Sequence, residues 1–230
     1  DLHQEMFWQS DHITYRPAGG YARIATLVKQ IRAESRGSSL FCDCGDTIHG
    51  TYPALKTQGQ ALIPVLNSLG LDAMTAHWEF AYGPKIFQQR VAELNYPMLA
   101  NNVYDKEIKK LVFHPHAVKE IGGLRVGLVG IASNIVDKTM PPSYSEGIYF
   151  TLGKDELPPI IDMLRTQEKA DLIVLVSHLG FPQEMKLLSE VHGIDVCLSG
   201  HTHNRLYKPA LRGKTIVIQS GCHGSFLGRL

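Results

Sequence analysis

Apolar and polar residues follow one another along the chain with two different periods, which predict helices and strands in turn. Between residues 20 and 35, Ile24, Leu27, Val28 and Ile31 recur at the spacing of one helical face. Shorter and almost continuous apolar runs are typical of buried strands. By these criteria we expect further helices at 58–70, 84–95, 153–170 and 182–193. Strands are expected at 38–46, 71–77, 96–102, 171–178, 194–201, 214–221 and 225–230.

Residues 112–133 contain two β-rich runs separated by Gly122 and Gly123, which predicts a hairpin. The longest stretch without a regular pattern is 136–153, and we expect it to form a loop at the rim of a site. Alternating helices and strands indicate an α/β protein with parallel and mixed sheet. With 230 residues, the chain is long enough for one substantial domain.

Composition excludes several classes of function. The formal net charge is +1 and there is no basic run, so we expect no nucleic-acid polymer as a partner. Apolar runs all stop short of the ~18 residues of a transmembrane helix, so we expect no membrane span.

The cysteines bear on the cellular compartment. Cys42 and Cys44 flank one strand residue and are poorly placed to bridge each other, and Cys197 and Cys222 complete the set of four without a Cys-x-x-Cys pair. Unpaired cysteines favour the cytoplasm. The chain starts abruptly, however, so a removed signal peptide and export stay open.

Several predicted strands end in a side chain that can bind a metal ion. Ligands of open α/β sheets bind beyond the carboxyl ends of the strands, so these side chains should converge there. Carboxylates mixed with imidazoles suit a pair of divalent ions, manganese first, with zinc, iron or nickel as alternatives. Two ions need a shared ligand, and one carboxylate can bridge them. The candidate ligands are Asp1, His3, Asp46, His77, His178, His201 and His203.

The order of these motifs resembles the calcineurin-like metallophosphoesterase superfamily, and within it the 5′-nucleotidase branch. The shared motifs are Asp-x-His, Gly-Asp, a strand-end residue followed by x-Glu, a single His, and Gly-His-x-His. The resemblance implies two β-sheets packed as a sandwich between helices, with the metals at the strand ends. It also implies that residues 1–230 form a single catalytic domain, without a first strand before Asp1 and without the C-terminal substrate domain that commonly follows.

The same resemblance implies a role for each ligand. Asp46 should bridge the two ions. Asn102 matches a recurrent family asparagine, which either contacts the site or ties down a loop. One ion should be held by Asp1, His3 and His203, and the other by His77, His178 and His201.

The sequence departs from the family at residues 76–81, which read Ala-His-Trp-Glu-Phe-Ala. His77 stands where 5′-nucleotidases have an asparagine ligand. Trp78 and Ala81 replace the histidine and aspartate that stabilise the transition state and assist the leaving group. The HWEF motif resembles the SoxB thiosulfohydrolases of sulfur oxidation. We expect Trp78 to form an aromatic wall of the substrate site, because indole offers only an N–H donor.

Two enzymatic functions are predicted, both using water activated by two metal ions. The first is hydrolysis of a small, nucleotide-like phosphate monoester. The alternative is a SoxB-like thiosulfohydrolase acting on a protein-bound thiosulfonate, with a sulfur-carrier protein as its partner. His49 and His223 follow predicted strands and are candidates for the missing acid, although a structural role is equally open for each. A metal-binding module without turnover is disfavoured, because all seven ligands are retained.

Overall fold

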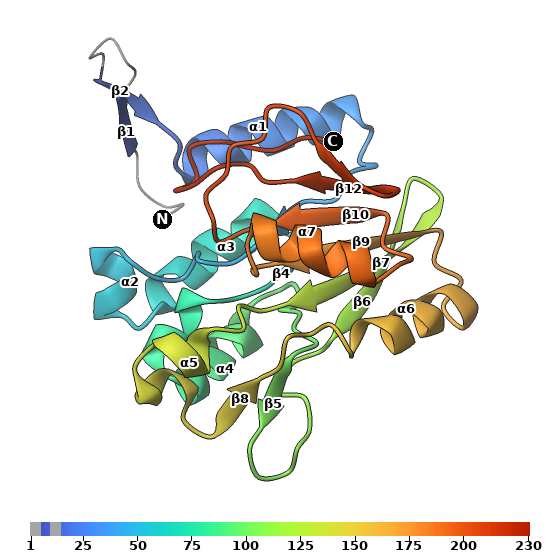
Figure 1. The fold of residues 1–230 in the computed structure, drawn as a ribbon. Coiled ribbons are helices and arrows are strands. Elements are labelled where there is room, and N and C mark those ends of the chain that lie inside the picture. Colours follow the sequence, from blue (N-terminus) through green and yellow to red (C-terminus); the bar gives the residue numbers. More distant parts are fainter. Residues whose placement is uncertain (1–5, 10–14) are drawn as a thin grey trace.

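A six-stranded mixed sheet forms the larger layer of the molecule (Figure 1). The computed structural model describes residues 6–9 and 15–230, with side chains from Gly19 onward. The strands β7, β9, β10 and β12 are parallel neighbours, while β6 and β11 pair antiparallel at the two edges. In sheet order they are β11 (Ala210–Arg212), β12 (Thr215–Ile218), β10 (Val196–Ser199), β9 (Leu172–Ser177), β7 (Leu124–Ile131) and β6 (His116–Ile121).

A second, less regular layer packs against this sheet. Its parallel strands β3 (Cys42–Asp43) and β4 (Ala73–Met74) continue through bridges from Met74 to Met98 and from Leu99 to His114. Between the layers lies a buried cluster formed by Ala73, Leu99, Val126, Leu128 and Val174. Gly130 allows the close approach, because a Cβ there would overlap the carbonyl of Leu99. Two further pairs are β1 (Met6–Gln9) with β2 (Tyr15–Ala18) and β5 (Val103–Asp105) with β8 (Ile148–Phe150).

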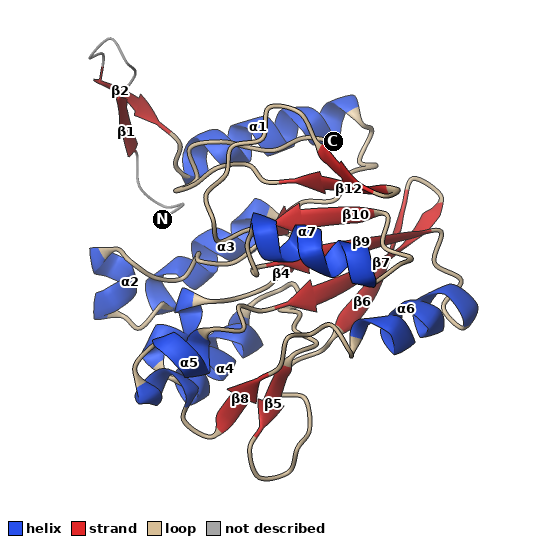
Figure 2. Ribbon diagram, viewed as in Figure 1, coloured by secondary structure: helices blue, strands red, loops and turns tan. Residues whose placement is uncertain are grey.

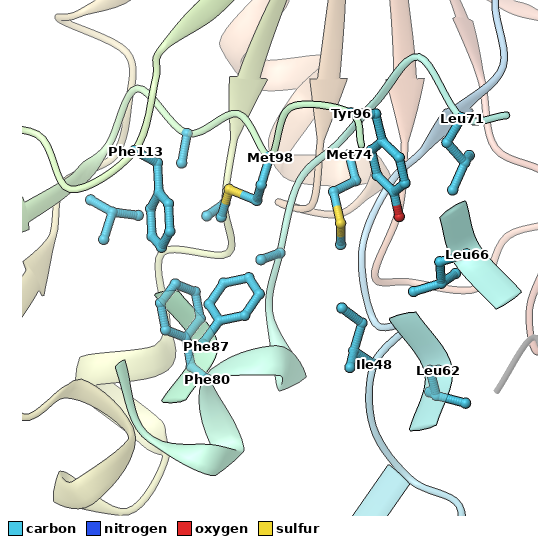
Figure 3. Packing of buried hydrophobic residues seen from close by; sticks show 14 of the residues in the cluster. Ile48, Leu62, Leu66, Leu71, Met74, Phe80, Phe87, Tyr96, Met98 and Phe113 are labelled. Carbon is cyan, nitrogen blue, oxygen red and sulfur yellow. The ribbon is translucent and has the colours of Figure 1, made fainter. Parts of the chain in front are cut away.

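Helices cover both layers (Figure 2). Residues of α6 and α7 pack on one face of the large sheet, where Leu164 and Leu187 join Leu175 in one buried cluster. The second layer and the helices beside it share a core of aromatic and aliphatic side chains (Figure 3). Within this core Phe80 and Phe87 lie edge to face with ring centroids 5.0 Å apart. The helices are α1 (Tyr21–Glu34), α2 (Tyr52–Lys56), α3 (Ile63–Leu69), α4 (Pro84–Glu93), α5 (Val136–Thr139), α6 (Leu157–Thr166) and α7 (Phe181–Glu190).

The predicted fold class is confirmed: sheets are flanked by helices in a mixed α/β arrangement. The predicted helices are present, and the hairpin turns at Gly122 and Gly123 as expected. Within the described part of the chain, no helix is both long and apolar enough to cross a membrane.

Three predicted elements were wrong. Residues 96–102 form no continuous strand and make only isolated bridges at Met98 and Leu99, because Pro97 has no N–H to donate to a ladder. Residues 225–230 form no strand, because β12 already has β10 on one side and β11 on the other. Residues 136–153 are not one irregular loop, since they contain α5, a 3-10 turn at Pro142–Ser145 and β8. Pro141 and Pro142 separate α5 from the 3-10 turn, because proline inside a helix lacks the N–H for the helical hydrogen bond and clashes with the preceding turn.

Candidate metal centre

Four predicted ligands converge at the carboxyl ends of four strands. Asp46 follows β3, His77 follows β4, His178 follows β9 directly, and His201 follows β10. One ligand atom from each side chain lies within 4.8 Å of the others. The three imidazole rings have centroids 5.0 to 5.2 Å apart. The sequence therefore predicted which side chains gather.

Asp46 lies at the centre of this cluster. Its Oδ1 is 3.2 Å from Nδ1 of His77, and its Oδ2 is 3.2 Å from Nε2 of His178. Burial raises the pKa of Asp46, but the adjacent imidazoles of His178 and His77 outweigh it and hold the pKa well below the usual range. Burial lowers the pKa of His178, whereas Asp46 raises it, with a net rise. The site therefore favours a positive charge beside the Asp46 carboxylate.

The donor set fits a divalent metal ion. Nε2 of His77 is buried without a hydrogen-bond partner among the described residues, and Nδ1 of His77 and Nε2 of His178 face the Asp46 carboxylate without a well-formed hydrogen bond. Burial, with the neighbouring His178 and His77, lowers the pKa of His201 to about 4. A neutral imidazole keeps the lone pair that coordinates a metal. A cation bound among these side chains would give the unpaired nitrogens and the carboxylate a common partner.

The backbone at the ligands is tightly turned. Asp46, His201 and His203 have φ angles of 62°, 72° and 58°, in the left-handed region that non-glycine residues seldom occupy. Gly45, at φ 91°, needs glycine for its conformation. Gly200 has a different reason, because a Cβ there would lie 2.9 Å from Nδ1 of His178. Both glycines therefore let the chain pass close to a ligand.

Glu79 holds the Asp46 and His77 loops together, a role that the sequence did not reveal. Its side chain is fully buried and accepts hydrogen bonds from the backbone N–H groups of Thr47 at 2.6 Å and His77 at 2.8 Å. The N–H groups of Ile48 and Asp46 add contacts at 3.2 and 3.3 Å. The sequence motif included Glu79, but it did not show what this side chain binds. Apart from His77, its hydrogen-bond partners lie more than thirty residues away in the chain.

Gln219 plays the same part for the loop that carries His201. Its amide donates to Oγ of Ser199 at 2.7 Å and to the carbonyl of Gly200. Its carbonyl oxygen accepts from the hydroxyl of Thr202 at 3.2 Å and from the backbone N–H of Asn204. A residue after β12 thus fixes the Gly-His-x-His loop after β10.

The remaining candidates lie around this cluster or outside the described residues. Asp1 and His3 belong to the latter. Asn102 is buried and ties a loop, because its amide donates to the carbonyls of Ala132 at 2.9 Å and Thr151 at 3.3 Å and its oxygen accepts from the N–H of Ala132.

Trp78 stands at the edge of the cluster with its indole 39% exposed. His49 stacks on it with ring centroids 5.7 Å apart, and Tyr144 contacts it edge-on with ring centroids 6.4 Å apart. A cavity of about 440 Å³ is lined by Trp78 and His49 together with Asp46, His201 and His203. His223 lines the same cavity. Burial lowers the pKa of His49 and of His223.

The mixed α/β fold and the cluster of potential metal ligands at its strand ends are typical of a metal-dependent hydrolase domain. A family model, described as calcineurin-like phosphoesterase, matches residues 1–205, so the chain belongs to that family. That family is metal-dependent, and the chain carries a cluster of potential metal ligands at its strand ends. The predicted superfamily is confirmed, and the relatives below confirm the 5′-nucleotidase branch.

One relative is a 5′-nucleotidase of Vibrio cholerae, which is 26% identical over 99% of this chain and 46% of that protein. The crystal structure of a sulfate thiohydrolase SoxB from Thermus thermophilus matches with a TM-score of 0.86 and 29% identity, over 90% of this chain and 39% of that one. A 5′-nucleotidase precursor from the same species shares the fold, with a TM-score of 0.80 and 24% identity over 95% of this chain and 47% of that one. The chain thus spans less than half of each.

Proposed function

We propose that this chain is the catalytic part of a dinuclear metallohydrolase that cleaves nucleotide-like phosphate monoesters. The observation that supports it most is the Asp46 cluster, where a carboxylate and three histidines meet beside a cavity. In this proposal His77, His178 and His201 serve one ion and Asp46 bridges it to the second. The second ion is served by His203 with Asp1 and His3.

Two divalent ions, manganese first, would supply Lewis acidity and activated water. The protein supplies position and shape. Glu79 holds the loops of Asp46 and His77, and Gln219 holds the loop of His201, so these ligands have buried hydrogen-bonded supports of their own. Trp78 forms a wall of the cavity, and His49 and His223, which also line it, are the side chains in position to exchange a proton with the leaving group.

A second candidate function is cleavage of a sulfur–sulfur bond in a thiosulfonate attached to a carrier protein. Two observations favour it. The chain has Trp78 where a phosphoesterase of this branch has histidine, and the SoxB structure resembles this chain at 29% identity. Both functions use the same ligands, so they differ in the substrate that fits beside Trp78.

A substrate panel decides between the two. The metal-stripped protein is reconstituted with Mn²⁺ and tested against nucleoside monophosphates, simple phosphomonoesters and a protein-bound thiosulfonate. We expect phosphate release from nucleoside monophosphates, absent in His77→Ala assayed in parallel. Sulfate release with no phosphate release would replace the first function by the second. Release of neither from the full-length protein, with both metals bound, would overturn both.

The bridging role of Asp46 has its own test. Asp46→Asn should lower occupancy at both metal sites, since each ion loses its share of one carboxylate. The substitution keeps the shape, and asparagine also tolerates the left-handed backbone at this position. Elemental analysis after dialysis measures the occupancy. Two tightly held ions per chain in this variant would show that the bridge lies elsewhere.

A further inference from the structure

A second group of potential metal ligands lies beside the first and contains sulfur. His203, Cys222 and His223 each place one ligand atom within 4.8 Å of the others. They come from two loops, at 200–204 and 221–224, that follow the neighbouring parallel strands β10 and β12. All three side chains line the cavity beside Asp46.

The spacing suits a tetrahedral ion. Zinc binds a thiolate at about 2.3 Å and imidazole nitrogens at about 2.0–2.1 Å, which separates neighbouring ligand atoms by roughly 3.6 Å. The rings of His203 and His223 have centroids 5.1 Å apart and stand at 71°, so their nitrogens can face a common point. His203 is exposed and Cys222 and His223 are half-buried, so none of the three side chains is locked in a packed core.

The chemistry of this group differs from that of the Asp46 cluster. Thiolate ligands select softer ions such as zinc, whereas carboxylates accept manganese. The Asp46 cluster has no sulfur ligand among its members. Cys222 forms no disulfide, and it is half-buried beside the cavity rather than packed in the core.

We propose that His203, Cys222 and His223 form a three-ligand site for a thiophilic divalent ion, with zinc preferred, and that this site competes with manganese for His203. On binding, the Cys222 S–H bond breaks, the sulfur bonds to the metal and the proton goes to solvent. A neutral imidazole has one lone pair, so His203 serves one ion at a time. The competition rests on the proposed function, which assigns His203 to the second manganese ion. The three-ligand site is independent of the proposed function.

Cobalt(II) tests the site directly, because a cysteine thiolate bound to it gives an intense charge-transfer absorption in the near ultraviolet. Metal-stripped protein should show this absorption when it is titrated with Co²⁺ to saturation, so that the Asp46 cluster is filled as well. Cys222→Ser should abolish it, and His223→Ala should weaken Co²⁺ binding by about 10–100-fold. Cys42→Ser is the matched control, because Cys42 lines the same cavity but is not part of the group, and it should keep the absorption. A folded wild-type protein without the absorption would overturn the site, as would its persistence in Cys222→Ser.

Zinc inhibition tests the competition. Zinc added to the manganese-loaded protein should inhibit hydrolysis, and Cys222→Ser should require about tenfold more zinc for the same effect. Equal zinc sensitivity in the two proteins would overturn the competition for His203. If the loaded protein proves inactive on every substrate, the proposed function fails while the cobalt absorption still decides the site. Displacement of bound Mn²⁺ by zinc, measured by electron paramagnetic resonance, then decides the competition.

Discussion

His77 and Trp78 are adjacent in the chain but have opposite surroundings. His77 is buried against Asp46, with 3% of the residue exposed, while 39% of Trp78 is exposed at the cavity. The turn that separates them begins at His77, whose carbonyl accepts a hydrogen bond from the N–H of Phe80 at 3.2 Å. Substitutions at the two positions should therefore fail in different ways.

Replacing His77 should affect metal binding. His77→Ala removes an imidazole donor that solvent does not match, and we expect at least one ion to be lost from the purified protein. His77→Asn should be milder, because an amide oxygen can still reach an ion from that position. Elemental analysis and Mn²⁺ titration compare the two. Full occupancy in His77→Ala would remove His77 from the ligand set.

Replacing Trp78 should affect the substrate. Trp78→Ala keeps the backbone N–H that donates to Oδ1 of Asp46 at 2.9 Å, so both ions should stay bound. It removes the ring between His49 and Tyr144, and KM for the preferred substrate should rise by about tenfold or more, as expected when a large aromatic contact is lost. Steady-state kinetics with metal analysis provides the measurement. Metal loss in this variant would contradict a wall role.

At the scale of elements, the site depends on loops that are held by buried side chains. Glu79 joins the loop after β3 to the loop after β4, and Gln219 joins the loops after β10 and β12. Neither side chain is among the candidate ligands. Both act on the ions through the positions of residues that bind them.

Glu79→Gln should weaken metal binding without removing a ligand. One of the two carboxylate oxygens becomes an NH₂ donor that faces backbone N–H groups, so the Asp46 and His77 loops lose part of their anchor. We expect a 10–100-fold loss of Mn²⁺ affinity, about that of other outer-shell substitutions. Glu120→Gln is the control, because Glu120 is exposed and its carboxylate pairs with Arg125 on the surface. Unchanged affinity in Glu79→Gln would mean that the ions order these loops unaided.

The convergence of four candidate side chains could be predicted from the sequence because each follows a local pattern; they are Asp46, His77, His178 and His201. Apolar runs that end in Asp or His marked the ends of β4, β9 and β10, and parallel strands bring such ends together. The shared hydrogen bonds of Glu79 and Gln219 could not be predicted in this way, since they connect loops from different strands. The failure at 225–230 has a similar origin, because the pattern of a segment does not show whether a sheet edge is free to receive it.

At the scale of the whole molecule, folding buries carboxyl groups that are costly to ionise, and Asp43 is one of them. Asp43 lies in β3 with its side chain hydrogen-bonded by Oγ1 of Thr47 at 2.6 Å and by the N–H of Gly45 at 3.0 Å. Burial raises its pKa from 3.8 to about 6, with nearby Glu79 adding to the rise and the hydrogen bond from Thr47 opposing it. A raised carboxyl pKa means that the folded state holds its proton more tightly than the unfolded state.

The contribution of Asp43 to stability should therefore be greatest below pH 3.8 and be lost as the pH rises through 6. Asp43→Asn cannot ionise, so the free-energy difference between variant and wild type should shift in favour of the variant by up to about 3 kcal/mol between pH 4 and pH 7. Urea unfolding of the metal-free proteins at several pH values measures this difference. A difference independent of pH would show that Asp43 ionises in the fold as it does in the unfolded chain.

The Trp78 indole, with His49 stacked on it, also provides a fluorescent probe of the cavity. The chain has two tryptophans, Trp8 and Trp78, so Trp8→Phe leaves the cavity indole as the single tryptophan emitter. Its fluorescence depends on the ring stacked against it and on the solvent around its exposed edge, both of which a bound substrate alters. Occupation of the cavity can then be followed by emission in real time and without a dye, even for a ligand that is never turned over.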